Sequence, residues 1–251
     1  MNTRAWLIGV GVGAFFVFLF TLLPARILSA FVPTGAVQVL GLTGTVWHGN
    51  AQTINAAGFQ FRDIDFEISP FGLLSGRLSV SFDGDWGTGY ARGEVSIGLT
   101  GSLSVRDLEA AGPLAPVLRT MNLRGNSGEL SLRIEALDVI DEWPTQMIGL
   151  VRVGNVPLSM IGVSGDASGH YELRFDVPNV ASEESIPGAL TDLGGPLQIV
   201  GVIRFSKPRN YSLNARIKPR PDAPNELKQG LMFIGIPDAD GSREFALSGS
   251  F

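Results

Sequence analysis

The chain has 251 residues, 19 basic and 24 acidic side chains, a formal net charge of −5 and 45% hydrophobic residues. Every acidic residue and all basic residues except Arg4 and Arg26 follow position 26, so the later part of the chain is strongly negative. A negative surface repels nucleic acid and anionic lipid head groups, and neither is expected as a partner. The chain has no cysteine, which excludes disulfides, thiolate metal sites and thiol nucleophiles.

Residues 5–25 carry no charge, and this uncharged stretch is long enough for a helix that crosses a bilayer. Cleavage after Ala25 or Ala30 would place Leu23 or Leu28 where a signal peptidase requires a small residue, so an uncleaved anchor is predicted.

The orientation of this anchor follows from the segment behind it. Residues 27–61 contain no charged side chain that would hinder export. We therefore expect residues 1–4 in the cytoplasm, a transmembrane anchor over residues 5–25, and an exported domain over residues 26–251.

Alternation of apolar and polar residues recurs throughout the exported part and predicts strands with one buried and one wet face. The clearest apolar series are Phe59, Phe61, Ile64, Phe66 and Ile68; Leu78, Val80 and Phe82; Leu130, Leu132 and Ile134; Tyr171, Leu173, Phe175 and Val177; Ile199–Phe205; Tyr211, Leu213, Ala215 and Ile217; and Phe245–Phe251.

Glycine, proline and aspartate punctuate these strands. Turns are predicted at Asp83-Gly84, Gly87–Gly89, Gly125-Asn126, Gly165-Asp166, Lys207–Asn210 and Asp240-Gly241.

Two short helices are expected, at Pro113–Leu118 and at Asp222–Gly235, with Asp222 as the N-cap of the second. The predicted fold is mainly β: an N-terminal transmembrane helix, then a curved antiparallel sheet that forms a groove or partial barrel, with one or two short capping helices. Two lobes, 26–112 and 113–251, are an alternative to one domain.

Several strings along the chain resemble the type II secretion system protein N family. They are Leu23–Arg26 (LPAR), Gly41–Gly49 (GLTGTVWHG), Ser69–Leu78 (SPFGLLSGRL), Tyr211–Pro224 (YSLNARIKPRPDAP) and Pro237–Gly241 (PDADG). The resemblance spans nearly the whole chain in length and order.

This resemblance implies a non-catalytic inner-membrane subunit with a periplasmic domain, in machinery that moves folded proteins from the periplasm across the outer membrane. Its expected partners are other type II secretion subunits or the secretin, together with the inner membrane. By analogy with AsmA-like proteins, a U-shaped sheet with an apolar trough is expected. No catalytic, cofactor-binding or metal-binding residue is carried over.

A few conspicuous residues admit a functional interpretation that we weighed against packing or turn chemistry. Ser164 and Ser168 lie near His170, but no nucleophile-elbow motif accompanies them and hydrolysis is not expected. The pairs Asp83/Asp85 and Asp238/Asp240 resemble fragments of calcium loops but lack the remaining ligands.

The other conspicuous residues also favour structural roles. Trp47 is expected to pack in a hairpin, and the neighbouring His48 to lie on the surface. Glu183 and Glu184 are expected in a solvated loop. Gly9 and Gly13 could allow close helix contact within the anchor.

Three function classes therefore stay open. The first is a structural subunit of a secretion machine, which acts through sheet edges or apolar faces. The second is a carrier of lipid or another hydrophobic ligand, which would use the trough. The third, a periplasmic enzyme, is disfavoured by the scarcity of histidine, lysine and cysteine. The first is our prediction and the second its alternative.

Overall fold

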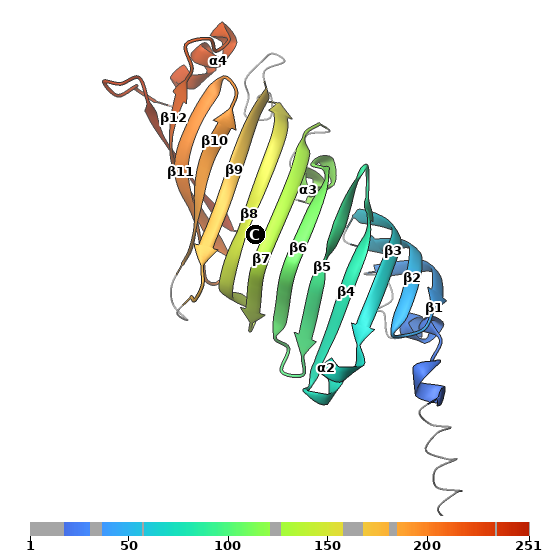
Figure 1. Cartoon of the computed structure of the whole chain (residues 1–251). Helices are drawn as coiled ribbons and strands as arrows, with labels where there is room; N and C mark the ends of the chain where they lie inside the picture. Colours follow the sequence, from blue (N-terminus) through green and yellow to red (C-terminus); the bar gives the residue numbers. More distant parts are fainter. Residues whose placement is uncertain are drawn as a thin grey trace, which may run out of the picture.

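A single antiparallel sheet of 13 strands dominates the chain, and neighbouring strands in the sheet are neighbours in the sequence (Figure 1). The computed structural model describes residues 18–30, 37–56, 58–120, 127–157, 168–180, 185–233 and 235–250. The strands are β1 (Val37–Gly44), β2 (His48–Ala56), β3 (Phe59–Ser69), β4 (Arg77–Trp86), β5 (Gly89–Gly98), β6 (Leu103–Pro113), β7 (Glu129–Ile140), β8 (Trp143–Pro157), β9 (Ser168–Val177), β10 (Ile186–Gly194), β11 (Leu197–Ser206), β12 (Asn210–Pro219) and β13 (Arg243–Ser250).

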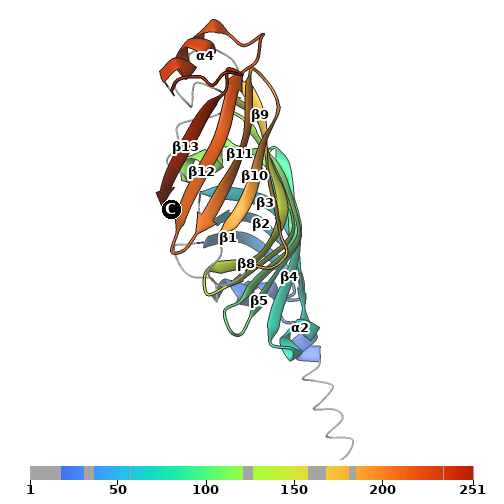
Figure 2. The same ribbon diagram turned by 90° about the vertical axis from the view of Figure 1, so that its left-hand side faces the viewer.

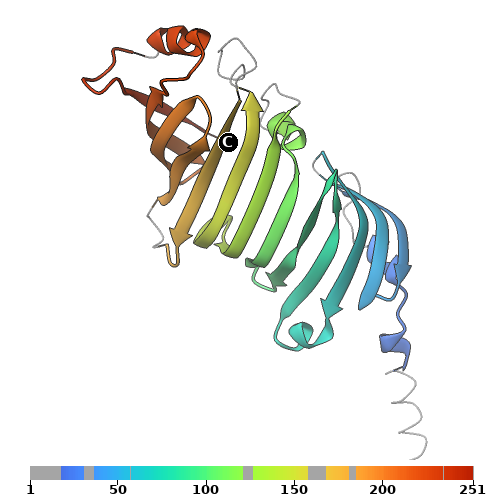
Figure 3. The same cartoon turned by 45° about the horizontal axis from the view of Figure 1, so that its top comes forward.

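The sheet is curled, because each strand is twisted against the next and several ladders contain register shifts. Figure 2 shows β1–β3 and β11–β13 bending to the same side of the middle strands. Figure 3 shows the same curl from another direction, with the strands arranged as a twisted trough.

Short helical segments lie at both ends of the sheet. The 3-10 helix η1 (Ala25–Ala30) precedes β1, and α2 (Pro70–Leu74) joins β3 to β4. We call the sheet end that carries α2 and the β1–β2 and β5–β6 connections the proximal end. At the opposite, distal end, α3 (Ala115–Thr120) joins β6 to β7, and α4 (Asn225–Gly230) with η3 (Leu231–Phe233) joins β12 to β13 (Figure 1).

One face of the sheet carries the buried apolar clusters and the other carries most of the ion pairs. Three clusters of buried side chains lie on the apolar face, and segments outside the sheet cover them in part. Leu227 of α4 and Leu231 of η3 cover the C-terminal cluster, Val180 the middle one, and Val117 of α3 the N-terminal one around Trp86. The core is therefore spread along the sheet.

The predicted architecture, mainly β with one large antiparallel sheet and a few short helices, is confirmed. The expected anchor lies largely outside the described residues, which include its helical residues 18–21. Among the residues that the structure describes, no helix has the length and apolar character needed to cross a membrane.

The predicted turn at Asp83-Gly84 is wrong, because both residues belong to β4 and the chain turns at Gly87 (φ +63°). Gly84 instead allows close contact with β3. A Cβ at this position would come within 2.7 Å of Cγ1 of Ile64.

The second predicted helix is shorter than expected. Helix α4 begins at Asn225 with Pro224 at its N-cap, and no side chain caps it, so the predicted role of Asp222 is also wrong. Proline disfavours helical backbone in the residue before it, which explains the later start. The first predicted helix forms with a shift: Pro113 completes β6, and α3 spans Ala115–Thr120.

Candidate functional site

An apolar groove lies on the apolar face of β1–β5, and it is the candidate functional site of the chain. Its volume is about 420 Å³, within the range of small-molecule pockets. The side chains or glycines that line it are all apolar: Leu28, Val39, Leu42, Ala51, Ile54, Phe61, Ile64, Phe66, Ile68, Val80, Phe82, Gly84 and Ala91.

Strand β3 supplies the centre of the groove by means of a β-bulge. Phe61 and Ile64 are three residues apart, so strict alternation would place them on opposite faces. Asp63 adopts the left-handed conformation (φ +49°), and the register with β4 shifts between Arg62 and Asp65. The extra residue returns the apolar series to the same face, so that both ends of β3 line the groove.

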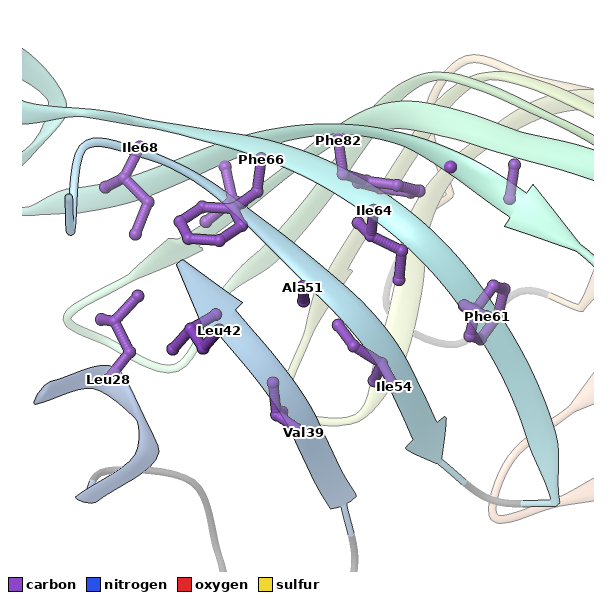
Figure 4. A pocket seen from close by; sticks show the side chains of 13 residues that line it. Leu28, Val39, Leu42, Ala51, Ile54, Phe61, Ile64, Phe66, Ile68 and Phe82 are labelled. Carbon is purple, nitrogen blue, oxygen red and sulfur yellow. The ribbon is translucent and has the colours of Figure 1, made fainter. Parts of the chain in front are cut away.

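Small residues form the floor of the groove and large ones its walls. Ala51 is fully buried between longer side chains such as Ile64 and Leu42 (Figure 4). Gly49 lies beside the ring of Phe66, where a Cβ would approach Cζ to 2.6 Å. The absence of a side chain at Gly49 thus lets the Phe66 ring pack closely against β2.

The 3-10 helix η1 borders the proximal end of the groove. It packs against β1, and Leu28 faces the groove from outside the sheet (Figure 4). A β-bridge between Pro24 and Thr45 and a 2.8 Å hydrogen bond from Val46 N to the Leu23 carbonyl hold this segment to the β1–β2 connection.

The C-terminal part of the same face is filled by the chain itself. There Leu227 and Leu231 pack on Leu197 of β11 and Ile217 of β12, and all four side chains are buried. This packing shows that the apolar face accepts aliphatic groups laid across the strands.

Ion pairs line the opposite, polar face. Glu109 lies 2.6 Å from Nη2 of Arg92 and 2.8 Å from Nη2 of Arg133, and the hydrogen bond from Arg92 holds the pKa of Glu109 below its usual range. Arg106 donates a hydrogen bond to Asp138 and likewise lowers the pKa of that carboxyl. These cross-strand pairs satisfy charges on the polar face and lie away from the groove lining.

Glu172 of β9 is the most buried acid on the polar face, with 7% of its surface exposed. Arg174 and Arg152 each donate a hydrogen bond of 2.9 Å to its carboxylate. These bonds, with that of Arg174 the stronger influence, hold the pKa of Glu172 below its usual range.

The groove can therefore hold apolar groups, but its lining offers no nucleophile, proton donor or metal ligand. Within the described part of the chain, no three His, Cys, Asp or Glu side chains are grouped so that they could hold a metal ion.

The residues considered for hydrolysis are not assembled into a site. Ser164 lies outside the described residues, and Ser168 and His170 lie two residues apart on β9. No hydrogen bond joins these two side chains in the described structure. His170 instead lines a second hollow, of about 610 Å³, at the distal end of the sheet.

The aspartates considered for calcium have different positions. Asp83 and Asp85 lie on β4. Asp240 accepts hydrogen bonds from the backbone and the hydroxyl of Ser242, at 3.0 and 2.6 Å, and the hydroxyl bond lowers its pKa. Asp238 and Asp240 thus belong to a turn closed by Ser242.

The remaining conspicuous residues lie at the proximal end or outside the described structure. Trp47 packs against Phe20, with ring centroids 4.4 Å apart, and the exposed His48 lies 3.9 Å from Glu67. Residues 9, 13, 183 and 184 are outside the described part.

The groove was predicted only as an apolar trough. The sequence signal that locates it is the shift in the alternation of apolar and polar residues between Phe61 and Ile64.

Taken together, the open sheet and its apolar groove define a β-sheet protein that offers contact surfaces. The family model for "Type II secretion system (T2SS), protein N" matches residues 35–246. The chain therefore belongs to the type II secretion system protein N family.

Curated relatives agree with this assignment. The chain is 24% identical over 244 residues to a type II secretion system protein N of Aeromonas hydrophila, with 91% of each chain covered. It is 24% identical over 240 residues to the protein of that name from Vibrio cholerae serotype O1, with 90% of each covered. No solved structure matches the chain.

Proposed function

We propose that the protein is a non-catalytic inner-membrane subunit of a type II secretion system, which helps to export folded proteins from the periplasm across the outer membrane through protein–protein contacts. The observation that carries this proposal is the family match over residues 35–246. The apolar lining of the groove supports a non-catalytic role, because it offers no reactive side chain. The other subunits of the machine, or its secretin, are the proposed partners.

The proposed topology places residues 1–4 in the cytoplasm, residues 5–25 in the inner membrane and residues 26–251 in the periplasm. It is supported by the uncharged sequence of residues 5–25 and by the helical backbone of residues 18–21. The division of the periplasmic part into lobes 26–112 and 113–251 stays a prediction. Strands β6 and β7, which lie on the two sides of this boundary, pair with each other in one sheet.

The free edge of β13 is the proposed docking edge for another subunit. Among the described residues, β13 pairs with β12 and no strand lies on its other side. A strand edge leaves backbone donors and acceptors open to a strand of another chain. At the other end of the sheet, the edge at β1 is bordered by η1.

Deletion of the gene tests the subunit role. Secreted enzymes should accumulate in the periplasm of the deletion strain, and the full-length gene should restore their release. Unchanged secretion would refute the role.

Single-cysteine cross-linking in the complemented strain then tests the docking edge. Ser248→Cys in β13 should form adducts with another subunit, whereas Ser81→Cys in β4, which is paired on both sides, should not. Both serines are exposed, and the chain has no other thiol. If neither cysteine forms an adduct while the deletion still blocks secretion, the β13 edge is the wrong surface and the subunit role stands.

A second candidate function is the binding or transfer of a lipid or another hydrophobic ligand. The observation that favours it is the groove of about 420 Å³ with its apolar lining. The purified full chain should then carry extractable lipid. Leu42→Trp, inside the groove, should reduce the bound lipid severalfold, and Leu40→Trp, on the exposed opposite face of β1, should not. Equal lipid content in both variants would refute this function.

A further inference from the structure

The proximal end of the sheet carries exposed apolar side chains in two neighbouring connections, β3–β4 and β5–β6. Phe71 of α2 is 78% exposed, and Leu99 in the β5–β6 connection is 91% exposed. Leu73 of α2 is also exposed. Large apolar side chains that gather in an exposed patch indicate a surface that contacts a partner or a membrane.

Hydrogen bonds hold this patch in place. The hydroxyl of Ser75, the C-cap residue of α2, donates to the Gly72 carbonyl at 2.8 Å. The amide of Leu99 donates to the Gly76 carbonyl at 3.0 Å, which ties the β5–β6 connection to the residues that follow α2. The exposed side chains of Phe71 and Leu99 are therefore presented by one ordered structure.

The patch is continuous with the end of the apolar N-terminal segment. The indole Nε1 of Trp47 donates a 2.7 Å hydrogen bond to the Phe20 carbonyl, and the two rings are in contact. The amide of Ile68 donates to the Trp47 carbonyl at 2.9 Å, and α2 begins two residues later. Contacts thus run from Phe20 through Trp47 to the start of α2. Figure 1 shows α2 at the same end of the sheet as the β1–β2 connection.

The charge around α2 differs from that of the whole chain. The three connections, residues 44–48, 69–77 and 98–103, contain no acidic side chain and include Arg77, while Arg26 lies in η1. The β7–β8 connection at the same end carries Asp141 and Glu142, so only the part of this end around α2 is free of acidic side chains. Anionic head groups are therefore not repelled at the exposed apolar side chains of α2 and the β5–β6 connection. Tryptophan is enriched where protein meets the membrane interface, which agrees with the position of Trp47.

We propose that the proximal end of the sheet lies on the membrane surface, with Phe71 and Leu99 inserted among the lipid head groups beside the anchor. This inference rests on the anchor of the proposed function. If residues 5–25 enter a bilayer, the contact between Phe20 and Trp47 holds the proximal end of the sheet beside that bilayer. The groove, bordered at this end by Leu28 and Ile68, then opens beside the lipid.

Single-cysteine labelling of the full chain tests this arrangement. Phe71→Cys and Leu99→Cys are labelled with an environment-sensitive dye in vesicles of phosphatidylethanolamine and phosphatidylglycerol, with lipids that carry a shallow quencher. Ile236→Cys is the matched control, because Ile236 is also apolar and 93% exposed but lies beyond α4 at the distal end. Labels at 71 and 99 should be quenched severalfold more than the label at 236.

Two results would overturn the proposal. If the labels at 71 and 99 are quenched no more than the label at 236, the proximal end faces water, and its apolar patch is then a protein-binding surface. If the chain does not float with the vesicles, the anchor is wrong and the membrane contact with it. Neither result depends on the secretion assay, so a failure here is distinguishable from a failure of the subunit role. Two label positions guard against a local defect, and circular dichroism checks that each variant is folded.

Discussion

At the residue scale, Glu172 shows how a nearly buried acid is kept charged on the polar face. Its carboxylate accepts one hydrogen bond from Arg174 and one from Arg152, both at 2.9 Å. The arginines remain half-exposed, so solvent screens them and the net gain from each ion pair is small. Together they nevertheless lower the pKa of Glu172.

We expect Glu172→Gln to reduce the free energy of unfolding at neutral pH by about 1 kcal/mol. Because the pKa of Glu172 is lowered in the folded state, its contribution is full above the unfolded pKa of about 4.3 and is lost as the pH falls through the folded value. Urea unfolding of both proteins should therefore show a difference that is constant near pH 7 and shrinks below about pH 4.

The exposed Glu129→Gln in β7 is the control for this measurement and should change stability little at any pH. A difference between the parent protein and Glu172→Gln that persists undiminished in acid would mean that the carboxylate charge is not the source of the stabilisation.

At the element scale, the bulge in β3 decides which side chains reach the groove. Asp63 occupies left-handed backbone, which aspartate tolerates better than most residues and β-branched residues tolerate poorly. The same device recurs at Asp107 in β6 (φ +48°), where the register of β5 and β6 also shifts.

Asp63→Val should cost about 1–2 kcal/mol of stability, because valine is strained in this conformation. Asp63→Gly should leave stability nearly unchanged, because glycine adopts positive φ freely. Chemical denaturation of the two variants checks this expectation. Equal loss in both would show that the Asp63 side chain, and not its backbone conformation, stabilises the bulge.

The strands that the sequence predicted well are those with large apolar residues at every second position, such as β9 with Tyr171, Leu173 and Phe175. Strand β5 was not singled out, because its residues on the groove face include Gly89, Ala91 and Gly93. These small residues differ little in hydrophobicity from the residues between them, so the alternation is weak. Strand β8 was missed for the opposite reason: Ile148 and Leu150 make its other face apolar too.

The groove could be predicted as a trough but not located in the sequence. Its lining comes from five strands and η1, and their register depends on the bulge at Asp63. The exposed apolar side chains Phe71, Leu73 and Leu99 were hidden as well, because α2 has only five residues, Pro-Phe-Gly-Leu-Leu, and lacks a helical period. Only the fold brings Leu99 next to Gly76, which follows α2.

At the scale of the whole molecule, each strand pairs only with the strands next to it in the sequence, so the contacts within the sheet follow the order of the chain. The main contacts of each strand are with the strands beside it, and the three buried clusters are separate along the sheet. In such architectures stability is close to a sum of neighbour interactions, and parts of the molecule can open independently. The C-terminal cluster under α4 should therefore be able to loosen while β2–β5 stay closed.

Leu227→Ala tests this independence, because Leu227 is fully buried in the C-terminal cluster and its truncation should cost about 2–5 kcal/mol locally. Hydrogen exchange should become faster in β11–β13 and remain unchanged in β2–β5. Gln229→Ala, at an exposed position of the same helix, is the control and should alter neither region.

Phe82→Ala should have the reciprocal effect, because Phe82 packs on the cluster around Trp86. If each buried substitution accelerates exchange equally in all strands, the sheet unfolds as one cooperative unit, and a change at the β13 edge would then be felt at the groove.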